Sequence, residues 1–243
     1  MARDAEAAIR LVWFLFQLAA LLFSFLVLPF VIAERKARRE RQAVAMSSRA
    51  RALGLRFSGV PNAQLNGTIK HLEKLDVGGS NRYAFNVVAG DFDGHPVVLF
   101  DYHYATSGAW WWSPSWRIPN YVCIAMVQLE KDFPELTIGP ESGGLFAAIA
   151  DAFGGGDIDF ESHEFSERFD VRSNDKKFAY DFCNAQMIEY LLANGQMSIE
   201  VEQSSLAMGF RDMHDVNRIK SRLKRLVEIR NLMPNYLFAG AHG

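Results

Sequence analysis

The chain has 243 residues, of which 49% are hydrophobic and 22% are charged. This composition excludes a disordered or low-complexity protein, and the length suits one domain with an attachment or two small domains. The formal net charge of −2 excludes a uniformly basic nucleic-acid-binding protein and a strongly acidic tail. Cys123 and Cys183 lie 60 residues apart without a CxxC or Cys/His cluster. We therefore expect two reduced, buried thiols rather than a disulfide framework or a zinc site.

Charge is distributed unevenly along the chain. Residues 1–33 have a net charge of 0, residues 34–51 have +5, and the remaining 192 residues have −7. We therefore expect zones of different character. In chain order the predicted zones are a short tail (1–10), a transmembrane helix (11–33), a basic juxtamembrane helix and linker (34–53), a soluble α+β domain (54–233) and a C-terminal tail (234–243).

Residues 11–33 form an apolar run of 23 residues with no charged side chain. At ~1.5 Å rise per residue, a helix of this length spans ~35 Å, which exceeds a hydrocarbon core of ~30 Å. The run is apolar on all sides, which disfavours a core helix of a small domain. A cleavable signal peptide is the alternative, because Val31 and Ala33 are small and follow Pro29. The run is longer than the apolar region of an ordinary signal peptide, and the segment before it has no net positive charge, so we predict an uncleaved transmembrane helix.

Basic residues on either side of this run predict its orientation. Two precede it and seven follow within 18 residues, so the positive-inside rule places the large C-terminal part in the cytoplasm. We predict a single-pass protein of the cell (inner or plasma) membrane. The same basic residues are attracted to anionic lipid headgroups, by ~1 kcal/mol each. Residues 43–51 are expected to form a short connector. The residues expected to set the topology or contact headgroups are Arg35, Lys36, Arg38, Arg39 and Arg41.

A β-hairpin is the clearest signal in the predicted soluble domain. Residues 83–92 and 95–104 are rich in β-branched and aromatic side chains, and they flank Asp93–Gly94, a pair typical of a type I′ turn. Residues 120–130 supply a third strand and complete an antiparallel meander. The predicted fold class is therefore α+β, with an antiparallel sheet covered by helices and preceded by one transmembrane helix.

Helical spacing of apolar residues predicts the helices that cover the sheet. The last helix has an apolar stripe from Val216 to Leu226, which we expect to dock on the sheet, with dimerisation as the alternative. Asp212 or Asp215 is expected to cap this helix. The expected helices are residues 62–75, 144–153, 177–195 and 216–233, and the further strands are residues 196–203 and 206–211.

Four tryptophans lie between the second and third predicted strands, in a stretch rich in Gly, Ser and Pro. We expect the rings to pack across the hairpin or onto the domain. Two alternatives are an anchor for a protein partner and insertion into a membrane interface, where indole rings are favoured. The residues of this candidate partner or membrane-interface loop are Trp110, Trp111, Trp112 and Trp116.

No complete catalytic or cofactor motif is present. Asp157, Asp159 and Glu161 alternate after glycines, but they lack the sixth-position glycine and distal glutamate of an EF-hand, so we expect a polar strand face and no metal site. Asp101 and His103 share one face of the second strand and form a weak candidate catalytic pair, because no nucleophile or ligand partner accompanies them. We therefore expect no catalytic, metal-binding or cofactor-binding residues.

A resemblance is carried by GDFDGHPVVLFDYHY (residues 90–104) and DIDFESHEFSERFDVRSND (residues 157–175), behind one apolar N-terminal segment. The chain resembles uncharacterised bacterial membrane-anchored proteins, which have a domain of unknown function after one transmembrane helix. The resemblance covers residues 54–230, and its most specific parts are Phe100–Tyr102 and Ile158–Ser162. It implies a bacterial, membrane-tethered α+β domain and supplies no activity, substrate or catalytic residue.

Two functional hypotheses follow. The favoured one is a non-enzymatic interaction or scaffold domain that holds a cytoplasmic protein partner at the lipid bilayer, because a large domain with an aromatic loop lacks a catalytic motif. The alternative is a tethered hydrolase or small-ligand-binding domain whose site combines distant residues. A polar pocket joining Asp101, His103 and residues 157–161 would favour the alternative. Nucleic acid is not an expected partner, and the oligomeric state stays open.

Overall fold

The structure is a computed structural model that describes residues 2–23, 28–60, 82–107, 117–141, 158–195, 197–213 and 216–239. The chain divides into two compact units, Met1–Ala45 and Met46–Gly243, and each is treated by itself below. The expected helices at residues 62–75 and 144–153 lie outside the described residues.

The first unit contains helix α1 (Ala2–Leu22) and most of helix α2 (Leu28–Ala52). The apolar run 11–33 is distributed over the end of α1 and the start of α2, with residues 24–27 outside the description. In the described ranges, no helix is long and apolar enough to cross a membrane.

The end of α2 belongs to the second unit. Residues 43–51, expected to form a connector, are helical, because Met46 and Ala50 lie four residues apart on one helix face and are both fully buried in the core. The chain then turns through Gly54, which has a φ of +74°, into the first strand.

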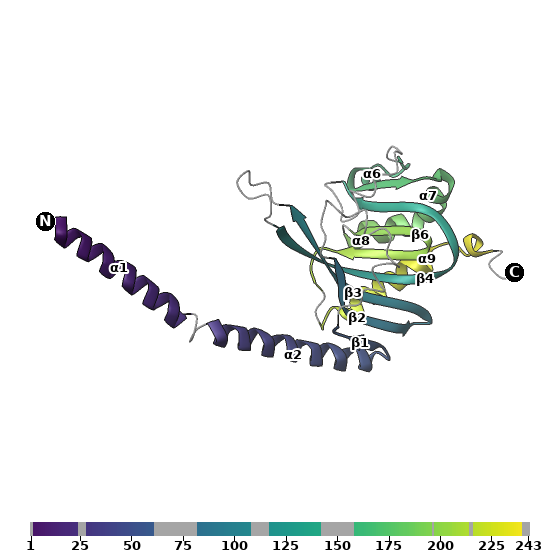
Figure 1. The fold of residues 1–243 in the computed structure, drawn as a ribbon. Coiled ribbons are helices and arrows are strands. Elements are labelled where there is room, and N and C mark those ends of the chain that lie inside the picture. The colour runs from purple at the N-terminus through teal and green to yellow at the C-terminus, as the bar shows by residue number, and fades with distance from the viewer. Residues whose placement is uncertain are drawn as a thin grey trace. The chain divides into compact units, whose positions relative to one another are not determined.

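The second unit is built on an antiparallel sheet, as Figure 1 shows. In the described residues the strand order is β1-β2-β3-β4-β5, and β6 pairs with β4. The expected α+β fold with an antiparallel sheet is therefore confirmed. The strands are β1 (Arg56–Ser58), β2 (Tyr83–Phe92), β3 (His95–Ser107), β4 (Arg117–Pro140), β5 (Phe169–Ser173) and β6 (Ser198–Phe210).

The expected hairpin is confirmed as β2 and β3. Phe92 pairs with His95, and the two residues between them, Asp93 and Gly94, have φ values of 51° and 81°. Positive φ at both central residues is the requirement of a type I′ turn. A register shift between Phe85 and Val88 marks a β-bulge in β2.

Strand β4 is the longest strand of the described sheet and extends well beyond the expected residues 120–130. Its first part pairs with β3 and its last part, Leu136–Pro140, pairs with β5. Strand β6 pairs along its other edge, with register shifts between Gln128 and Leu136. Figure 1 shows that β4 curves strongly, which lets one strand join both parts of the sheet.

After α2, the helices in the described residues of the second unit are α6 (His163–Arg168), α7 (Lys176–Phe182), α8 (Ala185–Asn194), α9 (Ile219–Leu232) and the short 3-10 helix η3 (Asn235–Phe238). The prediction of one helix over residues 177–195 is wrong, because α7 ends at Phe182 with Cys183 as its C-cap, and Asn184 caps the new helix α8. The two short strands expected at residues 196–203 and 206–211 are one strand, β6.

Helix α9 confirms that the last predicted helix docks on the sheet. Its Ile219, Leu223 and Leu226 are fully buried in the main core. Asp212 does not cap it, because Arg218 occupies the N-cap and the Asp212 carboxylate accepts hydrogen bonds from Arg218 and, at 2.7 Å, from Arg222. Asp215 lies outside the described residues.

The two faces of the sheet carry separate hydrophobic clusters. The larger cluster lies between the sheet and helices α7, α8 and α9, and contains Leu99 of β3. Because side chains alternate along a strand, the neighbouring Phe100 and Tyr102 belong to a smaller cluster on the opposite face. The helix-covered core is the part that positions the candidate site.

Candidate binding groove

The predicted site residues of the first unit lie on one helix. Arg35, Lys36, Arg38, Arg39 and Arg41 are all part of α2, and the Arg41 side chain is exposed. The tryptophans Trp110, Trp111, Trp112 and Trp116 lie outside the described residues.

Asp101 and His103 are buried in β3 on the helix-covered face of the sheet. Asp101 is fully buried and accepts a hydrogen bond of 2.9 Å from Asn86 Nδ2, which the β2 bulge directs toward it. The His103 ring is stacked on the Tyr83 ring, with 4.8 Å between their centroids. Tyr121 of β4 pairs with His103 on the other side, and its ring centroid lies 5.1 Å from that of His103. These contacts describe a packed polar cluster, and neither residue lines the groove described below.

Both cysteines are free and buried, as expected. Burial raises the pKa of the Cys123 thiol, and the nearby Arg222 offsets only part of this rise. Burial alone raises the pKa of Cys183. Since the thiolate is the nucleophilic form, neither cysteine is suited to covalent catalysis near neutral pH.

The acidic segment expected to form a strand is an irregular segment before α6. Asp159 and Glu161 are exposed, whereas Ile158 is buried and its N–H donates to the Val171 carbonyl. Asp157 lies outside the described residues. In the described ranges, no group of three or more His, Cys, Asp or Glu side chains is placed to hold a metal ion. The expected polar strand face at this segment is therefore wrong, because strand β5 begins only at residue 169.

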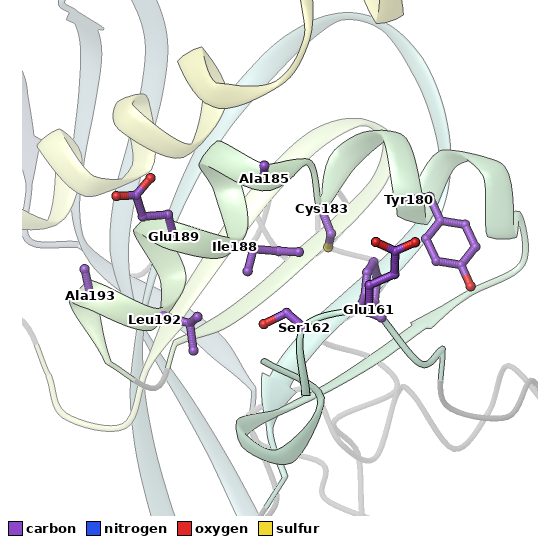
Figure 2. A pocket seen from close by; sticks show the side chains of 10 residues that line it. Glu161, Ser162, Tyr180, Cys183, Ala185, Ile188, Glu189, Leu192 and Ala193 are labelled. Carbon is purple, nitrogen blue, oxygen red and sulfur yellow. The ribbon is translucent and has the colours of Figure 1, made fainter. Parts of the chain in front are cut away.

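An open, largely apolar groove of about 790 Å³ lies beside this acidic segment. Helix α8 forms one wall and residues 160–162 form the other. In Figure 2 the Ile188 side chain of α8 points toward Cys183, and Glu161 and Ser162 lie across from the helix. Its volume falls in the range of ligand-binding sites, ~300–1,000 Å³. The groove is lined by Glu161, a residue of the predicted acidic segment.

The α8 wall is a stripe of residues at helical spacing. Ala185, Ile188, Glu189, Leu192 and Ala193 all line the groove, and their positions i, i+3, i+4, i+7 and i+8 place them on one face. Helix α8 buries a different face in the core through Met187 and Leu191, both fully buried. This helix therefore presents two apolar faces, of which only one is covered by the core.

The opposite wall is held by aromatic and backbone contacts. Phe160 contacts Phe165 and Tyr180 edge-on, each at 5.2 Å between centroids. The Phe160 N–H donates to Ser166 Oγ at 3.0 Å, and the Tyr180 hydroxyl donates to the Asp159 carbonyl at 3.2 Å. These contacts make the wall a preformed surface.

The polar groups of the groove do not form a catalytic set. Ser162 Oγ accepts the Phe165 N–H at 3.4 Å and caps α6, so it serves a structural role. Cys183 is a protonated thiol, as described above. The remaining charged groups are the exposed carboxylates of Glu161 and Glu189, which Figure 2 places at opposite sides of the groove. The arrangement is suited to binding an apolar surface with basic groups beside it.

The groove was missed by the sequence interpretation, although a signal for it exists. Apolar and small residues at positions 185, 188, 192 and 193 repeat at helical spacing beside the buried stripe of 187 and 191. An interpretation of residues 177–195 as one helix obscures this second stripe, because the stripe repeats at helical spacing only within α8 and does not continue through α7. Residues 160–162 gave no local signal, since only tertiary structure brings them to α8.

The fold defines a class of α+β domain with one antiparallel sheet and helices packed against its main core. No protein-family model and no curated protein matches the chain. Among solved structures, the chain is similar to the crystal structure of the mycobacterial trehalose monomycolate transport factor A, TtfA. The TM-score is 0.51 and the identity 11%, over 79% of this chain and 96% of that chain. At this identity the likeness establishes a shared fold.

Proposed function

We propose that the chain is a single-pass membrane protein whose second unit is a non-enzymatic binding domain that holds a protein partner at the cytoplasmic membrane surface. The observation that carries the binding role is the open apolar groove beside α8, in which Ser162 is a helix cap and Cys183 is a buried thiol. Such a site favours association over covalent chemistry.

Support for the membrane anchor comes from the exposed apolar side chains of α1. From Leu11 to Leu22 the exposed side chains include Trp13 at 61%, Phe16 at 67% and Leu21 at 56%. A continuous apolar surface of this kind is a feature of segments that contact lipid or another protein. The net charge of +5 in residues 34–51 supports an orientation with the second unit in the cytoplasm.

The alternative, a hydrolase or small-ligand-binding domain, would be favoured by a pocket that joins Asp101 and His103 to residues 157–161. The described groove includes Glu161 but not Asp101 or His103. The described groove is therefore not the pocket that would favour this alternative.

The fold likeness suggests a setting for the binding role. The structural neighbour is named as a transport factor for trehalose monomycolate. By analogy of fold, we propose that the present chain serves a membrane transport system as an accessory protein rather than as the transporter or an enzyme.

Anchoring is tested by carbonate extraction of membranes and by protease treatment of cells that carry the chain with a C-terminal tag. The proposal predicts that the full chain resists extraction and that the tag is protected in intact cells but cleaved in inside-out vesicles. The variant Leu18→Lys/Leu22→Lys should become extractable, because each charge near the bilayer centre costs ~2.5–3.5 kcal/mol. Recovery of the unaltered chain in the soluble fraction would contradict the anchor.

A further inference from the structure

Helix α8 has more apolar surface than its own fold uses. Met187 and Leu191 are fully buried and anchor the helix in the core. Ile188 and Leu192 also touch the core but remain half-exposed in the groove. An apolar stripe left partly exposed on a surface helix indicates an interaction site.

The shape of the stripe fits a second helix. Ile188 and Leu192 are one turn apart, and the small residues Ala185 and Ala193 lie beyond them at each end and are exposed. A ridge at i, i+4 spacing between small residues is the surface against which the side chains of another helix pack. Amphipathic helices bind such grooves through anchors at i, i+3 or i+4, and i+7.

The negative charge around the groove favours a partner with positively charged side chains. Glu161 and Glu189 lie at opposite sides of it (Figure 2), and both are exposed. The segment 158–193, which contains every residue that lines the groove, carries eight acidic and four basic side chains. An anionic lipid headgroup would be repelled here, whereas basic side chains that flank an apolar face would be attracted.

Resting on the proposed function, we propose that the partner presents an amphipathic helix with basic residues, and that its apolar side lies in the groove between α8 and residues 160–162. Apolar anchors contact Ile188 and Leu192. The flanking Lys or Arg side chains pair with Glu161 and Glu189. The groove is open, and this form suits a helix that lies along it. Binding of an acyl chain is favoured instead by an enclosed cavity.

The test uses the full chain in nanodiscs of phosphatidylcholine, which has no net charge. Two fluorescent synthetic 18-residue helical peptides share Leu at i, i+3/i+4 and i+7. They differ only in having Lys or Glu at every charged position. Each exposed ion pair contributes little, but two favourable pairs in the Lys peptide replace two repulsions in the Glu peptide. The Lys peptide should therefore bind about tenfold more tightly than the Glu peptide at low salt. Its advantage should shrink as salt screens the pairs.

Three variants locate the binding. Glu161→Lys/Glu189→Lys should reverse the preference between the peptides. Asp132→Lys/Glu167→Lys changes the net charge equally at exposed positions that do not line the groove, and should leave the preference in place. Ile188→Ser/Leu192→Ser should weaken the binding of both peptides at least tenfold. Circular dichroism of each variant confirms that the fold is retained.

Several results would overturn the proposal. Equal effects of the two charge-reversal variants on the peptide preference would show that the Lys peptide is attracted by the overall charge of an acidic domain and not by Glu161 and Glu189. Binding of cis-parinaric acid that Ile188→Ser/Leu192→Ser abolishes, without peptide binding, would assign the groove to lipid. A dimer of the full chain that the same variant dissociates would assign it to a second copy. Equal effects of the two charge-reversal variants would leave a protein partner and the membrane anchor standing, so failure of this inference is distinguishable from failure of the proposed function.

Discussion

Asn184 should determine both the break between α7 and α8 and much of the local stability. Its Oδ1 accepts hydrogen bonds from the N–H groups of Gln186 and Met187, at 3.0 and 3.2 Å. Its Nδ2 donates to the Leu232 carbonyl at 3.0 Å and more weakly to the Phe182 carbonyl at 3.3 Å. One side chain therefore caps α8 and ties it to the end of α9.

The magnitude follows from these two roles. Loss of an N-cap side chain costs about 1 kcal/mol, and loss of the bond to the Leu232 carbonyl about 1 kcal/mol more. Asn184→Ala should therefore lower the free energy of unfolding by about 2 kcal/mol, which corresponds to a fall in Tm of about 4–8 °C for a unit of this size. Asn184→Asp keeps the acceptor but loses the donor, and should cost about 1 kcal/mol or less.

The assay is urea unfolding of the full chain in mild detergent, followed by circular dichroism, with thermal melting as a second measurement. The expected order of stability is wild type, then Asn184→Asp, then Asn184→Ala. Equal destabilisation by the two variants would show that capping contributes nothing. A neutral Asn184→Ala would refute the assignment of the break to this side chain.

Three further predictions concern the turn, an ion pair and the thiols. Gly94→Ala should destabilise the chain by about 1 kcal/mol in urea unfolding, because Gly94 has a φ of +81°. Burial raises the pKa of Glu130, but the hydrogen bond and charge of Arg230 outweigh it, so the folded pKa lies below the ordinary value. The pair therefore stabilises the fold above the ordinary carboxyl pKa of ~4.3 and is lost as pH falls through the folded pKa. Glu130→Gln should lower stability at pH 7 by less than about 1 kcal/mol, since the glutamate is 42% exposed, and in urea unfolding the difference should shrink as the pH falls below ~4.3. Finally, Cys123 and Cys183 should react with iodoacetamide at pH 8 far more slowly in the native chain than in urea, and mass spectrometry of the labelled chain would contradict this if native labelling were rapid.

Local patterns predicted the elements whose stability is local. The hairpin was evident because Asp93–Gly94 requires positive φ values that few other pairs accept. Helix α9 was evident because its buried stripe repeats over the whole helix. The bend and length of β4 were not evident, because they depend on pairing with β5 and β6, which lie far along the chain.

The groove depended on tertiary contacts in the same way. Residues 160–162 reach α8 only because β5 pairs with the end of β4 and α6 packs above it. Short segments such as β1 and α6 have too few residues to show a period. The expected strand at the acidic segment failed for a related reason, since alternating carboxylates occur equally well in an extended loop. Its placement was decided by the buried Ile158.

The central claim is that the groove beside α8 holds a protein partner at the membrane. The most direct measurement is photocrosslinking in living cells, with p-benzoylphenylalanine in place of Ala193, an exposed groove residue, or of Asp132, an exposed control position. The account predicts a protein adduct in the membrane fraction from position 193 alone, and its loss in the Ile188→Ser/Leu192→Ser background. The absence of an adduct at position 193, or the same adduct from both positions, would contradict the claim.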